Sequence, residues 1–492
     1  MREDANSLNS VDDDTLILIF GNLAVPEILC LRQAPLSRLR IVWRNACVSD
    51  VLPRGYPFSG EPLNDLPDLE SAARSAYRLG EKWASPSPAP RYTRSFVANP
   101  STHIELVRFV PGRDWLITVS KGIWSVITAW DIKGNGDIRK IAEWSPKGAL
   151  FNGNVVVNTD SSSDAIAAVL VPTSSGSNLN ILSLIIQDGR TDFVVIASWP
   201  SSMRPVTLKG DSLASSDDMT QTEVRNWKTR DSAILSTPGN FGDTAWQLDR
   251  CIQVVFAFES ILVIKARSVH LFPAIQLGSS ALALLLPIAR HSFGWIDGVS
   301  VTMTPHPDPI DNSICHAPIH ILLRAESDDP WAQEEHNLRF FTLAPNPHYR
   351  SHDSESEADK ETSELRMSPY IFPPTLTAEV FSCHGSLRCA DIMLRPYGTA
   401  IWVHPRNRAV RGLIASDVHL QQIYVPDVLA SNERLLAAVF PGPLNRSGLL
   451  EVEAKTLGTN ENNDWTCLDY DEAPTGRIAL GASSGTVTIL EM

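Results

Sequence analysis

Cysteine and histidine, which bind transition metals and act in catalysis, stand close together at two places in the chain. The stretch CHGSLRC contains Cys383, His384 and Cys389, but no second pair follows at the spacing of a zinc site. In HAPIH, Pro318 breaks the helix that would bring His316 and His320 to one face. We therefore expect buried thiols beside a turn, two strand or loop histidines, no metal ion and no cofactor.

Glycine and serine clusters are the next candidates for chemistry. The stretch GASSG (481–485) lacks the G-x-S-x-G spacing of a nucleophile elbow and precedes a terminal strand rather than a helix. FVPGRDW (109–115) and KGNGD (133–137) are glycine turns without the strand–loop–helix context of phosphate binding. The sequence therefore predicts a protein that is not an enzyme.

The net charge of the chain indicates which partners to exclude, and its cysteines indicate the cellular compartment. The 492-residue chain has 42 basic and 56 acidic residues, a formal net charge of -14. Nucleic acids and anionic membranes both attract clustered positive charge, so we expect neither as a partner. Seven scattered cysteines and an N-terminus without a signal-peptide layout predict a cytoplasmic or nuclear protein.

Three zones of the chain differ in the spacing of their apolar residues, and the first zone has the spacing of helices. Four apolar residues recur there at three- and four-residue steps, which stacks them on one helix face: Leu16, Ile19, Phe20 and Leu23. A second helix is expected from Pro26, and a third from an N-cap at Asp68 to Trp83. The following ASPSPAPRYT (84–93) predicts a proline-rich linker that holds the helices away from the rest of the chain.

From about Ser95 onward, short apolar runs alternate with turn residues, which predicts an all-β array. A sandwich and a propeller both fit, and a propeller is favoured because one four-strand pattern recurs. It includes Trp130-Asp131, is repeated around Trp227, and returns at the C-terminus. At about 45 residues per blade the stretch allows up to eight blades, and two long insertions reduce the expected number to about seven, with both ends of the propeller sharing one blade. We interpret Trp130 as an indole packed between blades.

The predicted domains are 11–52, 53–94 for a helical extension and linker, and 95–492 for the propeller. Two polar stretches, near 202–222 and 350–368, are expected to be flexible insertions. The acidic, serine-rich part of the second (351–364) is expected to be a solvated loop, with a basic partner or phosphorylation as alternatives.

The segment VDDDTLILIFGNLAVPEILCLRQ (11–33) resembles an F-box, the helical motif that docks onto the Skp-type adaptor of cullin-based ubiquitin ligases. The order of helices, linker and degenerate WD-repeat-like propeller is similar to that of fungal F-box proteins. Two features depart from the family pattern. Val11-Asp12 replaces the usual Leu-Pro, and Pro35 interrupts the expected third helix, which is shortened by a real truncation or a gene-model error.

The resemblance implies a multidomain protein with a small all-α F-box followed by an all-β propeller. It would be a non-catalytic substrate receptor of a Skp–cullin–F-box ubiquitin ligase, whose propeller binds an unknown protein substrate. The residues expected to face the adaptor are Leu16, Ile19, Phe20, Leu23, Val25, Pro26, Ile28, Leu29 and Leu31. The alternative is a propeller scaffold for protein interactions, with a self-capping helical segment and no ligase role.

Overall fold

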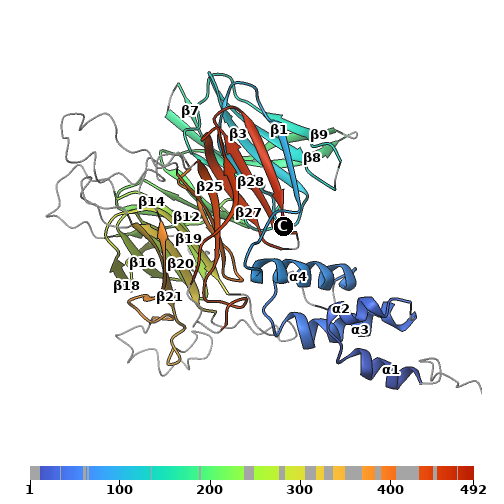
Figure 1. Cartoon of the computed structure of the whole chain (residues 1–492). Helices are drawn as coiled ribbons and strands as arrows, with labels where there is room; N and C mark the ends of the chain where they lie inside the picture. Colours follow the sequence, from blue (N-terminus) through green and yellow to red (C-terminus); the bar gives the residue numbers. More distant parts are fainter. Residues whose placement is uncertain are drawn as a thin grey trace, which may run out of the picture.

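The computed structural model shows a β-propeller with a helical segment at one side (Figure 1). It describes residues 12–33, 35–58, 63, 66–134, 136–174, 176–187, 190–237, 249–275, 283–304, 317–325, 336–349, 368–382, 389–405, 432–446, 452–473 and 475–492.

Seven β-sheets make the seven blades of the propeller, which confirms the predicted number and excludes the sandwich alternative. Blades 1, 2, 5 and 6 use strands that follow one another along the chain, whereas blade 3 takes its last strand, β17 (Ala283–Leu285), from between two strands of blade 4. Blade 1 is β2 (His103–Phe109), β3 (Trp115–Lys121), β4 (Ser125–Asp131) and β5 (Arg139–Trp144). Blade 2 is β6 (Val155–Val157), β7 (Ala167–Thr173), β8 (Gly176–Gln187) and β9 (Arg190–Pro200). Blade 3 is β10 (Arg204–Lys209), β11 (Ser212–Ser216), β12 (Gln221–Asn226), β13 (Ser232–Ser236) and β17 (Ala283–Leu285).

The remaining blades complete the ring. Blade 4 is β14 (Cys251–Ala257), β15 (Ser260–Lys265), β16 (Ser268–Pro273) and β18 (Ala289–Ser292). Blade 5 is β19 (Ile296–Met303), β20 (Ile319–Ala325), β21 (His336–Leu343) and β22 (Thr375–Ser382). Blade 6 is β23 (Ile392–Leu394), β24 (Thr399–His404), β25 (Glu433–Val439) and β26 (Lys455–Asn460). Blade 7 is β27 (Trp465–Asp471), β28 (Arg477–Ala482), β29 (Thr486–Glu491) and β1 (Tyr92–Val97).

Blade 7 closes the ring by joining the two ends of the propeller. β1 runs antiparallel to β29 from the pair Tyr92↔Glu491 to the pair Val97↔Thr486. Arg94 reinforces this pairing with an ion pair to Glu491 at 2.9 Å. The prediction that both ends share one blade is therefore confirmed, and the first strand begins at Tyr92, three residues before the expected boundary.

The indole of Trp130 is structural, as interpreted from the sequence. Its Nε1 donates a hydrogen bond to the Thr118 hydroxyl at 2.9 Å. Its ring lies 4.7 Å from that of Phe96 on β1, within an apolar cluster shared by blades 1 and 7.

The expectation of a flexible insertion near 202–222 was wrong. These residues form β10, β11 and the start of β12. The polar residues that suggested a loop belong to two hairpin turns, where Gly210 adopts a positive φ of 59° and Asp217 accepts hydrogen bonds from two backbone N–H groups. The serines of β11 are small enough to be buried beside Leu213. The second expected insertion, 350–368, lies outside the described residues except for Ser368.

The helical segment comprises α1 (Asp13–Phe20), α2 (Val25–Cys30), the 3-10 helix η2 (Pro35–Arg38), α3 (Arg40–Ala46), the π-helix η3 (Cys47–Val51) and α4 (Leu69–Ala84). Asp12 caps α1, because its carboxylate accepts a hydrogen bond from the Thr15 N–H at 2.7 Å. Asp68 caps α4 in the same way through the Ser71 N–H at 3.0 Å, as predicted.

A helix also follows Pro35, which had been expected to interrupt one. Pro35 starts η2, and α3 continues directly into η3, so helical backbone runs from Arg40 to Val51. Trp43 ties the two pieces together by donating from Nε1 to the Ser37 carbonyl at 2.9 Å. The shortening of the third F-box helix stays a prediction.

Closure through β29 should contribute strongly to stability. Ile489 is fully buried in the cluster that joins blades 7 and 1. We expect Ile489→Ala to lower the free energy of unfolding by about 2–5 kcal/mol, because it leaves a cavity in a closed ring. Denaturant unfolding would measure this, with Ile123→Ala, at an 88% exposed site, as control. Equal stability of the two variants would contradict the proposed closure.

Candidate interaction surface

The nine residues expected to face an adaptor do not all lie on the surface. Leu16, Phe20, Val25 and Ile28 are buried in the segment's own core, together with Trp43 of α3. Three others are partly buried against that core: Leu23, Leu29 and Leu31. Only Ile19 and Pro26 are exposed. Adaptor contact by this set stays a prediction, and in the free chain most of it is covered.

A different residue dominates the exposed face of α1. Leu18 is 70% exposed and its neighbour Ile19 is 43% exposed; together they are called the α1 surface here. Three further large apolar residues of the helical segment are exposed by about two-fifths: Leu39, Ile41 and Val48. The sequence carried this signal, since LILIF is apolar on every side of a helix and one core can cover only one side.

The helical segment is fixed to the propeller, which corrects the expectation that a proline-rich linker holds it away. The link is α4, which lies nearest the β-strands in Figure 1. Leu69 and Ala73, in its first half, belong to the helical core. Leu79 and Trp83, in its second half, are buried among residues of blades 6 and 7. The amphipathic face predicted from the sequence is therefore divided between two cores.

Three hydrogen bonds also connect the helical segment to blade 6, and we call this contact region the junction. The Tyr397 hydroxyl donates to the Phe58 carbonyl at 2.8 Å, and Lys455 Nζ donates to the Ser85 carbonyl at 2.6 Å. Arg446 donates to the Leu52 carbonyl at 3.2 Å.

The backbone also approaches closely at Gly55, which has a positive φ of 68°. A Cβ there would lie 1.8 Å from the Pro443 carbonyl oxygen. Only glycine fits this part of the junction, because any side chain would displace the loop from blade 6.

A buried carboxyl group lies behind the junction. Glu472 accepts hydrogen bonds from the Thr399 hydroxyl and, at 3.3 Å, from the Tyr397 N–H. Burial raises the pKa of Glu472 to about 7. Tyr470, next to Thr399, packs edge-on against Trp83 at 6.0 Å. The ionisation of Glu472 is thus close to the contacts that hold α4.

The candidate catalytic and metal-binding residues show structural roles where they are described. His320 lies on β20 with its two ring nitrogens 2.8 and 3.1 Å from the hydroxyls of Thr304 and Thr342. Burial lowers the pKa of His320 to about 4, so its ring is neutral at physiological pH. Cys389 is fully buried, whereas Cys383, His384 and His316 lie outside the described residues. The GASSG stretch is the end of β28 and the turn that leads to β29.

In the described part of the chain, no group of three or more histidine, cysteine or acidic residues could hold a metal ion. Of the helices in that part, none is long and apolar enough to cross a membrane.

Comparisons with known proteins show only distant similarity. No family model matches the chain, and no curated protein matches it. The WD40 domain of Neurospora crassa Pan2 superposes with a TM-score of 0.43 and 9% identity, covering 82% of this chain and 97% of that domain. A chain of an active polycomb repressive complex 2 in the basal state gives a TM-score of 0.45 and 12% identity, covering 84% and 98%. Similarity this distant transfers no property of either protein to this chain.

The buried carboxyl predicts a pH dependence of stability. With a folded-state pKa raised from 4.5 to about 7, Glu472 keeps its proton after the unfolded chain has lost it. Its contribution to the free energy of unfolding is complete below pH 4.5 and is lost as the pH rises through 7. The free energy of unfolding should therefore fall by about 3 kcal/mol over this range. Glu472→Gln stays neutral, so it should remove this decline from denaturation curves measured between about pH 5 and pH 8.

The matched control is Glu143→Gln, which removes a half-exposed carboxylate on β5 that is ion-paired with Lys140. We expect Glu143→Gln to keep the wild-type decline of stability with pH. A Glu472→Gln protein with the same decline would contradict the assignment of this group.

Proposed function

We propose that the chain is a non-catalytic interaction protein in which the helical segment docks one protein and the propeller binds another. As the F-box resemblance implies, the first would be a Skp-type adaptor, which connects the chain to a cullin. The propeller would then bind a protein substrate for ubiquitin transfer, and the chain would be the substrate receptor of the ligase.

The observation that carries this proposal is the exposure of the α1 surface. Leu18 and Ile19 lie on a helix that has no more than slight contact with α4, the element joined to the propeller. Burying such side chains in a partner's groove supplies about 1.5–3 kcal/mol each, before the costs of association. Exposed apolar residues grouped on one helix are a common mark of a protein-binding site.

The propeller suits the second role because its architecture presents many loops and strand edges around a rigid ring. The candidate catalytic histidine that is described there, His320, is held between the hydroxyls of Thr304 and Thr342, so partner binding rather than chemistry is the activity we assign to the propeller.

A scaffold with a self-capping helical segment is the second candidate. It is favoured by the burial of Leu79 and Trp83 against blades 6 and 7, which makes α4 part of the propeller's core. This cap does not involve α1, so docking and capping are compatible in one molecule. The two candidates differ only in whether α1 binds an adaptor.

Co-expression with the host's Skp-type adaptor, followed by size-exclusion chromatography, tests the difference. We expect a stoichiometric complex with the wild-type chain. The double variant Leu18→Asp, Ile19→Asp should lose the complex, because two carboxylates would be buried without partners at the interface. Both side chains are already exposed, so the variant should remain folded.

A control variant makes the result specific. Ile123→Asp places one aspartate on an apolar site of blade 1 that is 88% exposed, and it should keep the complex. Leu16→Asp is avoided because Leu16 belongs to the helical core, and its loss would unfold the segment. If the folded wild-type chain forms no adaptor complex, the scaffold alternative is correct.

A further inference from the structure

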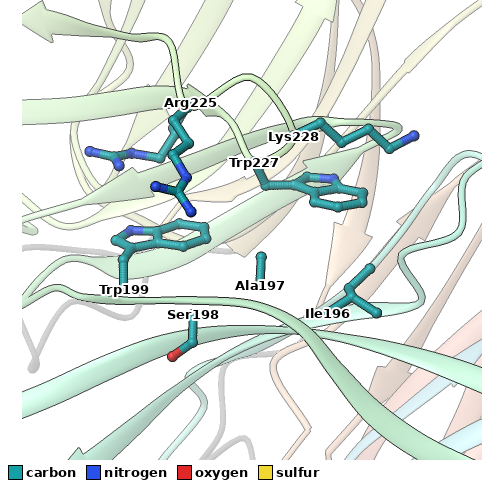
Figure 2. A pocket seen from close by; sticks show the side chains of 8 residues that line it. Ile196, Ala197, Ser198, Trp199, Arg225, Trp227 and Lys228 are labelled. Carbon is teal, nitrogen blue, oxygen red and sulfur yellow. The ribbon is translucent and has the colours of Figure 1, made fainter.

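A pocket of about 470 Å³ opens between blades 2 and 3, away from the helical segment. One wall is the end of β9, which contributes Trp199 above a floor at Ala197. The other wall is the turn after β12, which contributes Trp227. Figure 2 shows the two indoles on opposite sides of the opening.

Basic side chains lie directly against these indoles. The Arg225 guanidinium lies 5.3 Å from the ring centre of Trp199, and Lys228 Nζ lies 5.1 Å from that of Trp227. Figure 2 shows Arg225 reaching over Trp199. The Trp227 Nε1 donates to the Gly210 carbonyl at 3.3 Å, which fixes the orientation of its ring. The aromatic walls are therefore held in place before any ligand arrives.

The pocket is positively charged, although the chain as a whole is negative. Its lining contains three basic residues and no acidic residue. Arg225 is ion-paired with Glu223 at 2.7 Å. Lys228 is ion-paired with Asp211 at 3.1 Å and with Asp164 at 3.9 Å, and all three acidic partners lie outside the lining. Arg230 is exposed and forms no ion pair with any residue that the structure describes. Its charge is available to a ligand.

The wall formed by β9 also offers unpaired backbone groups. Among the described strands, β9 is the outer strand of blade 2 and pairs only with β8. Its register shifts at Ile196, which is an extra residue between the pairs Ile181↔Ala197 and Leu182↔Val195. Such a bulge re-aims the side chains beside it, here those that line the pocket.

We propose that this pocket binds an extended, acidic peptide of a partner protein, which pairs with the free edge of β9. The backbone of the peptide continues the sheet of blade 2 by strand addition. Side chains that alternate along it then face the pocket, where an acidic group pairs with Arg230 and its neighbour packs between Trp199 and Trp227.

A nucleic acid strand is the main alternative ligand, because bases stack on indoles and phosphates attract basic residues. The strand edge favours a peptide, since backbone amide and carbonyl groups are matched by another peptide backbone and not by a base. The net negative charge of the whole chain, -14, also disfavours a nucleic acid partner.

Fluorescence anisotropy with two labelled eight-residue peptides tests the proposal on the full chain. One peptide alternates valine and glutamate, and the other alternates valine and lysine. We expect only the acidic peptide to bind. Arg230→Ser should weaken that binding about tenfold, because one charge-assisted hydrogen bond is lost. Arg230→Glu should abolish it.

Matched variants separate the pocket from general charge and folding effects. Arg339→Ser removes an arginine whose side chain is 44% exposed on β21 of blade 5, and should leave binding unchanged. Trp199→Ala should weaken binding while Trp124→Ala, on a turn of blade 1, should not. If Trp199→Ala fails to fold, the Arg230 variants decide alone.

Three results would overturn the proposal. They are no binding of the acidic peptide to the folded chain, binding that the Arg230 variants do not change, and binding of an oligothymidylate that competes with the peptide through the same residues. The Leu18→Asp, Ile19→Asp chain should bind the peptide normally. Failure of the adaptor experiment therefore leaves this inference intact, and the reverse also holds.

Discussion

The division of one helix between two cores determines how this molecule is assembled. α4 buries Leu69 and Ala73 with the other helices, and Leu79 and Trp83 with blades 6 and 7. Neither core is complete without it, so the helical segment and the propeller are joined by packed side chains and not merely by a linker. The chain then leaves α4 through Ser85, whose carbonyl is held by Lys455, and enters the closing blade as β1.

This arrangement places the two proposed interaction sites on different parts of the molecule. The α1 surface lies on the part of the helical segment that α4 does not cover, while the pocket near Trp199 lies between blades 2 and 3. The ring connects them as a rigid body, since every blade packs on its neighbours and β1 closes the circle. A partner bound at one site is thus held in a defined orientation to a partner at the other.

Local features were predictable from the sequence, and long-range ones were not. The cap at Asp68, the β-turns and the blade pattern around Trp130 follow from residue spacing over a few positions. The second half of α4 meets residues about three hundred or more positions away, as Phe58 meets Tyr397, and no local pattern encodes such a contact. Residues 202–222 were wrongly predicted to be a flexible insertion, because the polar residues of two hairpin turns and the serines of β11 resemble the composition of a loop.

The central claim is that the junction holds the helical segment in one position on the propeller. Cys30 is exposed on the helical segment, and Ile123→Cys would add a second label site on blade 1. With Cys315 and Cys383 replaced by serine, the distance between two spin labels can be measured by pulsed electron paramagnetic resonance. A single narrow distance distribution is expected. A broad distribution, as a flexible proline-rich linker would give, would contradict the account.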